Sequence, residues 1–381
     1  MVTAKYAGLL EMLFNRFSNI VAIYTLDFYF TKMKQKSIRF VKDYMIKKGF
    51  VLFFFYSFVF SQDNLLLRQA DTLTSSMIGE ETITRLDGNI IFQKKDIILK
   101  GSFATQSDKN SIINLYGDVS IQQPEQIIYC DSLSFNNDTE FFEMYGNIKI
   151  KNGSRFISAD KATLDQISDQ MTLIDNCEIK DENSNKVFGD KILLSFQDNA
   201  LQSFKVLSNG LILSKNSGYE KIDDLEKNIE NEDILKAETI LAKLENDEIQ
   251  NIELIGMAST LIHLYNDSLY DGINEISGDK ITMNIQNESA KKLIAEGGTV
   301  GRYTPNASNE NVQEEIDYEA DRVEFEVDKK ISEMYGVVKV IHDKMDLSAA
   351  HINVNWSNNV LEAFSDNPFN KEEINRPVLI E

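Results

Sequence analysis

Six acidic residues recur through the chain, each directly after a small residue or a cysteine. They are Asp131, Asp160, Asp190, Glu238, Asp279 and Asp321. A row of carboxylates could bind calcium, or supply a general acid and base for cleaving polysaccharides. The alternative is structural, because a carboxylate at a corner of the chain accepts backbone N–H bonds there. Every repeat carries the acid, whereas an active site breaks the symmetry of a repeat, so the structural role is favoured.

Other residues that could perform chemistry are few. The three histidines, His263, His342 and His351, each lie in an alternating strand pattern with no fixed nucleophile nearby. Cys130 and Cys177 permit one disulfide bridge, although lone cysteines in strands usually act as small buried hydrophobes. No spacing typical of a zinc, iron or nucleotide site is present. The sequence therefore predicts no catalytic residue, no metal site and no cofactor.

A repeat of about 29 residues positions the acids. LDGNI at 86–90, LYGDV at 115–119, MYGNI at 144–148 and LIDNC at 173–177 follow one another at steps of 29 residues, and looser copies lie near residues 256, 297 and 336. The acids fall between these motifs. A fixed period of this length indicates stacked structural units.

Apolar residues alternate on both sides of each acid, as expected for strands with one buried face. The alternation changes parity at the acid: Ile128 and Cys130 precede it, whereas Leu133 and Phe135 follow it. A slip of one residue would turn a flat strand inside out, so each repeat must bend or bulge there. We predict an all-β fold, an open-ended β-jellyroll or solenoid made of a stack of strands.

The inward-facing positions are the candidates for a lipid-binding groove. They are Ile90, Phe92, Val119, Ile121, Leu133, Phe135, Ile148, Ile150, Leu164, Ile192, Leu194, Phe196, Ile281, Met283, Val323 and Phe325. Each methylene of an acyl chain buried in such a groove contributes about 0.8 kcal/mol. The same alternation also fits side chains that fill a core against one another, so the two interpretations stay open.

The N-terminal region indicates export. Lys47 and Lys48 precede an uninterrupted apolar run at 50–60, which is too short to span a bilayer and is typical of a signal peptide over 45–62. Residues 1–44 form an extension of uncertain origin: either translation starts at Met33 or Met45, or 20–30 forms an uncleaved anchor. We expect a periplasmic protein, with outer-membrane association also open.

Charge and composition restrict the partners and the domain organisation. Beyond residue 62 the chain has 30 basic and 57 acidic residues, a net charge of −27, which argues against nucleic-acid binding. We predict one repeat domain over 63–370 and a tail at 371–381. The domain is expected to divide into sub-halves, 63–215 and 236–366, on either side of an acidic loop at 216–235.

The alternation of SAD at 158–160 with YGN at 145–147, continued through at least six units, resembles the OstA-like family. This family includes the LptA-type periplasmic proteins of lipopolysaccharide transport. The resemblance covers about residues 66–366, which is about twice the repeats of a minimal bridge subunit. It implies a V-shaped stack of antiparallel strands, with acyl chains in the apolar interior and headgroups on the open side.

The resemblance also implies partners. They are lipopolysaccharide or a related glycolipid, and other transport proteins or a second copy of this chain, joined by pairing of edge strands. Two alternatives remain: a secreted β-helical carbohydrate-active enzyme, and a structural β-solenoid filament or adhesin without lipid.

Overall fold

The computed structural model describes residues 65–380, apart from 198–199, 223–224, 247, 267, 287–288, 308–313, 357, 359 and 375. The extension at 1–44 and the signal segment at 45–62 lie outside the described residues. Residues 64–381 cluster as one compact unit. Within the described ranges there is no helix long and apolar enough to cross a membrane.

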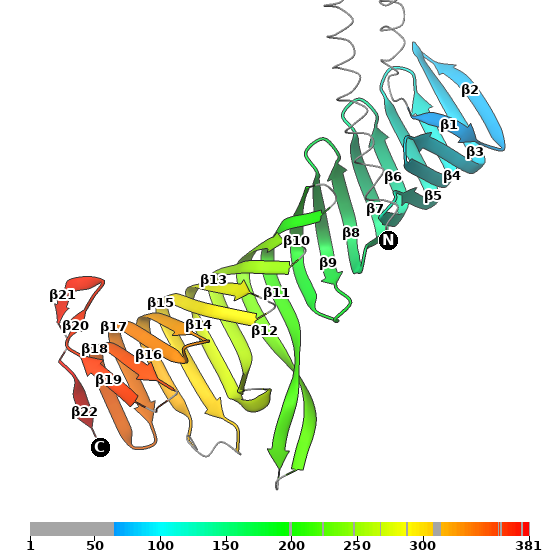
Figure 1. The fold of residues 1–381 in the computed structure, drawn as a ribbon. Coiled ribbons are helices and arrows are strands. Elements are labelled where there is room, and N and C mark those ends of the chain that lie inside the picture. The colour runs from blue at the N-terminus through cyan, green and yellow to red at the C-terminus, as the bar shows by residue number, and fades with distance from the viewer. Residues whose placement is uncertain are drawn as a thin grey trace, which may run out of the picture. The chain divides into compact units, whose positions relative to one another are not determined.

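The described residues form strands throughout (Figure 1). The strands are β1 (Leu66–Gln69), β2 (Thr72–Ile78), β3 (Glu81–Lys94), β4 (Ile97–Ser107), β5 (Ile112–Gln122), β6 (Gln126–Asn136), β7 (Phe141–Asn152), β8 (Arg155–Asp165), β9 (Gln170–Lys180), β10 (Lys186–Gln197), β11 (Ala200–Ile222), β12 (Leu225–Glu245), β13 (Glu248–Asn266), β14 (Leu269–Gln286), β15 (Ser289–Pro305), β16 (Ile316–Glu326), β17 (Ile331–His342), β18 (Met345–Asn355), β19 (Val360–Phe364), β20 (Asp366–Asn367), β21 (Asn370–Ile374) and β22 (Val378–Ile380). The all-β prediction is confirmed.

The strands lie side by side in one 20-stranded sheet, with β20 and β21 in a small separate one. From β3 to β18 each strand pairs antiparallel with the next one along the chain. A β-helix has parallel strands. The antiparallel stack of the prediction is therefore confirmed, and the alternative of a β-helix is wrong.

Each of the strands β3 to β18 bends near its middle, where the register shifts. Between β6 and β7, for example, the regular pairing stops at Tyr129 and resumes at Ser132. We call the two halves of the bent sheet arm 1 and arm 2. In odd-numbered strands the segment before the bend belongs to arm 1 and the segment after it to arm 2. In even-numbered strands the assignment is reversed. The bend predicted at the acid is confirmed.

The segment 216–235 is not the acidic loop that its composition suggested. It lies in β11 and β12, which pair as a long antiparallel hairpin from Ser203 opposite Lys243 to Ile222 opposite Leu225. Regular backbone pairing holds this hairpin together although its side chains are mostly polar. The sheet continues through this region without a break, so the hairpin does not interrupt the pairing between the two predicted sub-halves.

Short strands form the two edges of the sheet. At one edge, β1 pairs with arm 2 of β3 and β2 with arm 1. At the other, β19 pairs with arm 1 of β18 and β22 with arm 2. The residues predicted as a tail, 371–381, thus include β22, whose backbone completes this edge.

Candidate functional site

The space between the two arms, which we call the trough, is lined by the predicted inward-facing residues. All sixteen face this interior, and fourteen of them are buried; Phe196 and Phe325 are only partly buried. Their burial follows from the change of parity at each bend, which turns the apolar side chains of both arms toward one another. In this conformation the side chains pack against one another, as the stacked rings of Phe135 and Phe142 do, with centroids 4.3 Å apart.

At most bends an acid on one strand lies against one or two left-handed residues on the next strand; at the bend of β4 and β5, Ser102 takes the place of the acid. Gly146 and Asn147 have φ values of 75° and 48°, and a Cβ added to Gly146 would collide with the Asp131 carboxylate. Only glycine satisfies both constraints there. The Nδ2 of Asn147 donates to Asp131 Oδ2 at 2.8 Å. The acid and the glycine therefore fix the corner of the strand pair.

The other corner acids occupy equivalent exposed positions. Asn176 donates to Asp160 at 2.6 Å and Asn209 donates to Asp190 at 2.8 Å. Glu238, Asp279 and Asp321 lie against the glycines of their corners, as Asp131 does. Sequence reasoning expected backbone donors and missed a further corner acid, Asp71, which accepts from Asn89 at 2.9 Å. The Ala-Asp pair at 70–71, ahead of Gly88, was the signal that could have identified it.

The acids are distributed along the outside of the bends and do not gather into one site. Among the described residues no group of three or more His, Cys, Asp or Glu side chains is placed to hold a metal ion. His263 lies on β13, 3.0 Å from Asp233 through Nδ1, and His351 stacks between Tyr335 and Phe364. All three histidines lie on strands, with His342 at the end of β17, as the alternating pattern predicted.

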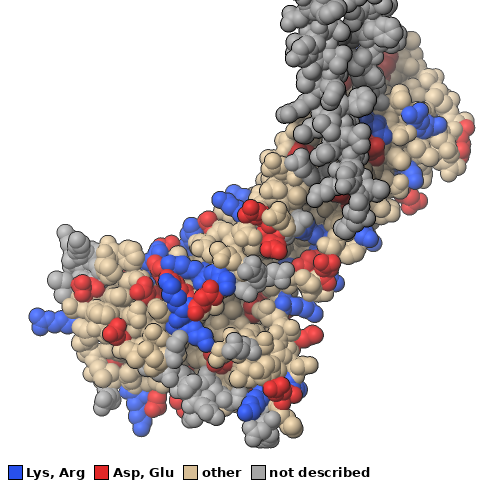
Figure 2. Space-filling model, viewed as in Figure 1, with Lys and Arg blue, Asp and Glu red and all other residues tan. Residues whose placement is uncertain are grey.

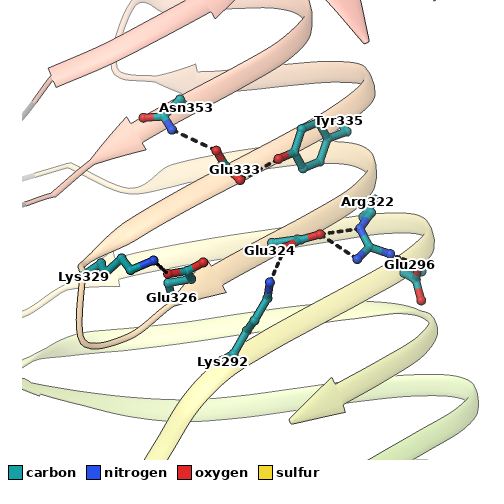
Figure 3. Close-up of polar contacts among 9 residues, drawn as sticks. All are labelled: Lys292, Glu296, Arg322, Glu324, Glu326, Lys329, Glu333, Tyr335 and Asn353. Carbon is teal, nitrogen blue, oxygen red and sulfur yellow. Dashed lines mark hydrogen bonds and ion pairs between the residues drawn. The ribbon is translucent and has the colours of Figure 1, made fainter. Parts of the chain in front are cut away.

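Charged side chains occupy the outer face of the sheet. Around β15 to β18, Arg322 contacts Glu296 and donates to Glu324, which also accepts from Lys292 (Figure 3). Burial acts to raise the pKa of Glu324, but the hydrogen bonds from Lys292 and Arg322 outweigh it and lower that pKa. Basic and acidic residues are intermixed on the visible surface (Figure 2). Because these charges point outward, they do not interrupt the apolar lining of the trough.

Side chains of the two arms touch at the rim of the trough, by which we mean the edge of each arm farthest from the corners. Lys94, at the arm 2 end of β3, places Nζ 2.6 Å from Oε1 of Glu140, in the turn that joins β6 and β7 on arm 1. Near the other end of the sheet, Lys330 Nζ donates to Asn266 Oδ1 at 2.8 Å. The resemblance implied an open side; at these two positions side chains bridge it.

The trough exposes apolar residues at both edges of the sheet. Leu73 and Met77 of β2 share a face with the buried Leu86 of β3, yet they are 57% and 77% exposed. At the other edge Leu361 of β19 and Leu379 of β22 are 37% and 53% exposed on the inward face. The apolar interior is therefore open-ended.

Part of the sequence matches a known protein family. Residues 62–204 match the family model described as OstA-like protein. The resemblance predicted from the sequence is confirmed over these residues.

Among solved structures, the chain is similar to LptH of Pseudomonas aeruginosa, described as the LptA homologous periplasmic component of the lipopolysaccharide transport device. The match has 10% sequence identity and a TM-score of 0.30, and covers 39% of this chain and 94% of that chain. No curated protein matches the chain.

Proposed function

We propose that this protein is a non-enzymatic periplasmic carrier that holds the acyl chains of lipopolysaccharide, or of a related envelope glycolipid, in the trough. The observation that carries the proposal is the continuous apolar lining, which ends in exposed inward-facing residues at both edges of the sheet. About 0.8 kcal/mol per buried methylene is enough to retain several chains without a specific contact. The OstA-like match over 62–204 supports the same function.

The edges of the sheet support a bridge that joins subunits or partner proteins. β2 carries no charged residue, and all seven of its side chains are exposed. Natural edge strands are usually protected by charges, prolines or bulges, and an unprotected one is a template for another strand. We therefore propose that another transport protein, or a second copy of this chain, pairs with β2 and extends the trough.

Lipid analysis of the purified protein tests the proposed function. The protein is purified without detergent from cells that make lipopolysaccharide, and bound lipid is extracted and identified by mass spectrometry. We expect stoichiometric glycolipid in the wild type and in Ser134→Asp, whose new charge points outward. Phe135→Asp places an unpaired charge on the inner face and should lose the lipid.

Three outcomes would contradict the proposal. They are wild-type protein without bound lipid, equal lipid in both variants, and assembly into filaments while no lipid is bound. The last outcome would support the structural alternative. Circular dichroism of each variant confirms that the protein compared is folded.

A further inference from the structure

The contact between Lys94 and Glu140, which we call the rim pair, joins segments far apart in the fold. Lys94 follows Ile90 and Phe92 in the alternation of β3, so its side chain points into the trough from arm 2. Glu140 lies in the turn after β6 on arm 1, 46 residues further along the chain. The ion pair therefore crosses the mouth of the trough and holds the two rims together.

A charge at this position is unusual. The Lys94 side chain is 8% exposed, and its Nζ lies 5.9 Å from the centroid of the Phe135 ring. Removing an ammonium group from water is costly, and a buried ion pair often contributes no more stability than apolar residues of the same size. An apolar residue would continue the alternation of Ile90 and Phe92 and close the rim equally well.

The rim pair differs from an apolar contact in the energetic cost of separating its two sides. When an apolar rim separates, it exposes apolar surface to water. When the rim pair separates, the Lys94 ammonium regains hydration and Glu140, already 37% exposed, keeps its own, which offsets much of the lost attraction. The arms can thus part at this point while the corners, which are fixed by the acids and glycines, stay intact.

We propose that the rim pair is a gate on the side of the trough, which opens between β3 and β7 and admits an acyl chain laterally. The identity of the ligand rests on the function proposed above, whereas the opening itself does not. The lining residues in this conformation are packed against one another, so an acyl chain requires such a separation of the arms.

The native cysteines report the opening without any lipid. Cys130 faces the trough from arm 2 of β6, within the gated part, and Cys177 faces it from β9, outside that part. Both thiols are free and buried. Burial raises the pKa of Cys130 to about 12 and that of Cys177 to about 11, so both should react slowly with a maleimide in the closed state.

The experiment measures maleimide labelling of each cysteine by peptide mass spectrometry, in the full chain. Lys94→Glu and Glu140→Lys place like charges across the rim, and the double variant exchanges the two charges. We expect each single variant to label Cys130 about tenfold faster, which corresponds to about 1.4 kcal/mol in the opening equilibrium. The double variant should return toward the wild-type rate, and labelling of Cys177 should stay unchanged.

Equal labelling of Cys130 in all four proteins would overturn the gate. Equal acceleration of Cys130 and Cys177 would overturn it too, because that result reports general loosening of the fold. A double variant that labels as fast as the single variants would show that pairing across the rim is not what closes it.

A second measurement separates the gate from the proposed function. A fluorescent twelve-carbon fatty acid is mixed with each protein, and the rate of its binding is followed. Faster uptake in the single variants supports a gate for acyl chains. Faster cysteine labelling with no fatty-acid binding in any variant would leave the opening established and contradict the lipid carrier.

Discussion

The regular and the extended parts of the sheet use the same corners but differ in the length and chemistry of arm 2. Strands β3 to β10 are 11 to 14 residues long, whereas β11 to β15 are 17 to 23 residues long. In the regular part, apolar residues alternate along both arms, and Lys94 at the arm 2 rim of β3 is a charged exception. In the extended part, the outer portion of arm 2 carries polar side chains instead.

These polar side chains contact one another. The Asp233 carboxylate accepts the His263 backbone N–H at 2.8 Å and also contacts Asn216. Asn231 Nδ2 donates to the Tyr265 hydroxyl at 2.9 Å. The comparison shows that longer strands do not widen the apolar interior. The width of the apolar interior is set by the short repeat, and the added length forms a polar extension.

The largest expected effect is the cost of removing an aromatic ring from the lining. Phe135 on β6, in the regular part, is 1% exposed, whereas Phe325 on β16, which follows the extended part, is only partly buried. Phe135→Ala should lower the free energy of unfolding by about 4 kcal/mol, and Phe325→Ala by about 2 kcal/mol. Urea unfolding followed by circular dichroism measures both. Equal losses would mean that the two interiors are packed alike.

The polar extension should depend on Asp233. Asp233→Ala leaves the His263 backbone N–H and the Asn216 amide without their acceptor, which should cost about 2 kcal/mol. Amide hydrogen exchange should show the loss of protection over β11 and β12, with β3 to β10 unaffected. Unchanged exchange in the hairpin would contradict the role given to this carboxylate.

The same residue predicts a pH dependence. Desolvation by burial raises the pKa of Asp233 above its ordinary value of 3.8, against the hydrogen bonds from His263 and Asn216. A raised pKa in the folded state means that stability present below pH 3.8 is lost as the pH rises through the folded pKa. The unfolding free energy of the wild type minus that of Asp233→Asn should therefore decrease as the pH rises through that range. A difference that rises with pH would contradict this sign.

The smallest expected effect concerns the corner at Gly256 and Met257, where methionine rather than asparagine follows the glycine. Met257 has a φ of 45° at the position where Asn147 lies in the regular part. A side chain of this kind is disfavoured in the left-handed region, so Met257→Gly should raise the unfolding free energy by about 0.5–1 kcal/mol. Asn147→Gly is the comparison: it also places glycine in the left-handed conformation but removes the hydrogen bond to Asp131, so it should lower the unfolding free energy. Thermal unfolding of both variants measures the difference. A loss of stability in Met257→Gly would refute it.

The sequence predicts the regular part well because period-two alternation and the acid-glycine spacing are local signals. The bend at Asp131 and the inward position of Phe135 both follow from them. The hairpin over 216–235 could not be predicted in this way, because Asn231 and Asp233 occupy the positions where alternation would place apolar residues. Pairing of backbones, which leaves no trace in hydropathy, forms that element.

The rim pair is missed for a different reason. The alternation of β3 places Lys94 inward, but its contact with Glu140 depends on the angle between the arms. That angle results from the geometry of the corners, where left-handed residues such as Gly146 and Asn147 lie against an acid on the preceding strand. A pattern within one strand carries no information about it.

The central claim, that the trough holds acyl chains, is tested most directly by photo-crosslinking in living cells. A photoreactive phenylalanine is placed at position 135, facing inward, or at position 134 on the same strand, facing outward. The account predicts a crosslinked glycolipid from position 135 and none from position 134. Crosslinks of equal yield from both positions, or none from position 135 in a folded protein, would contradict it.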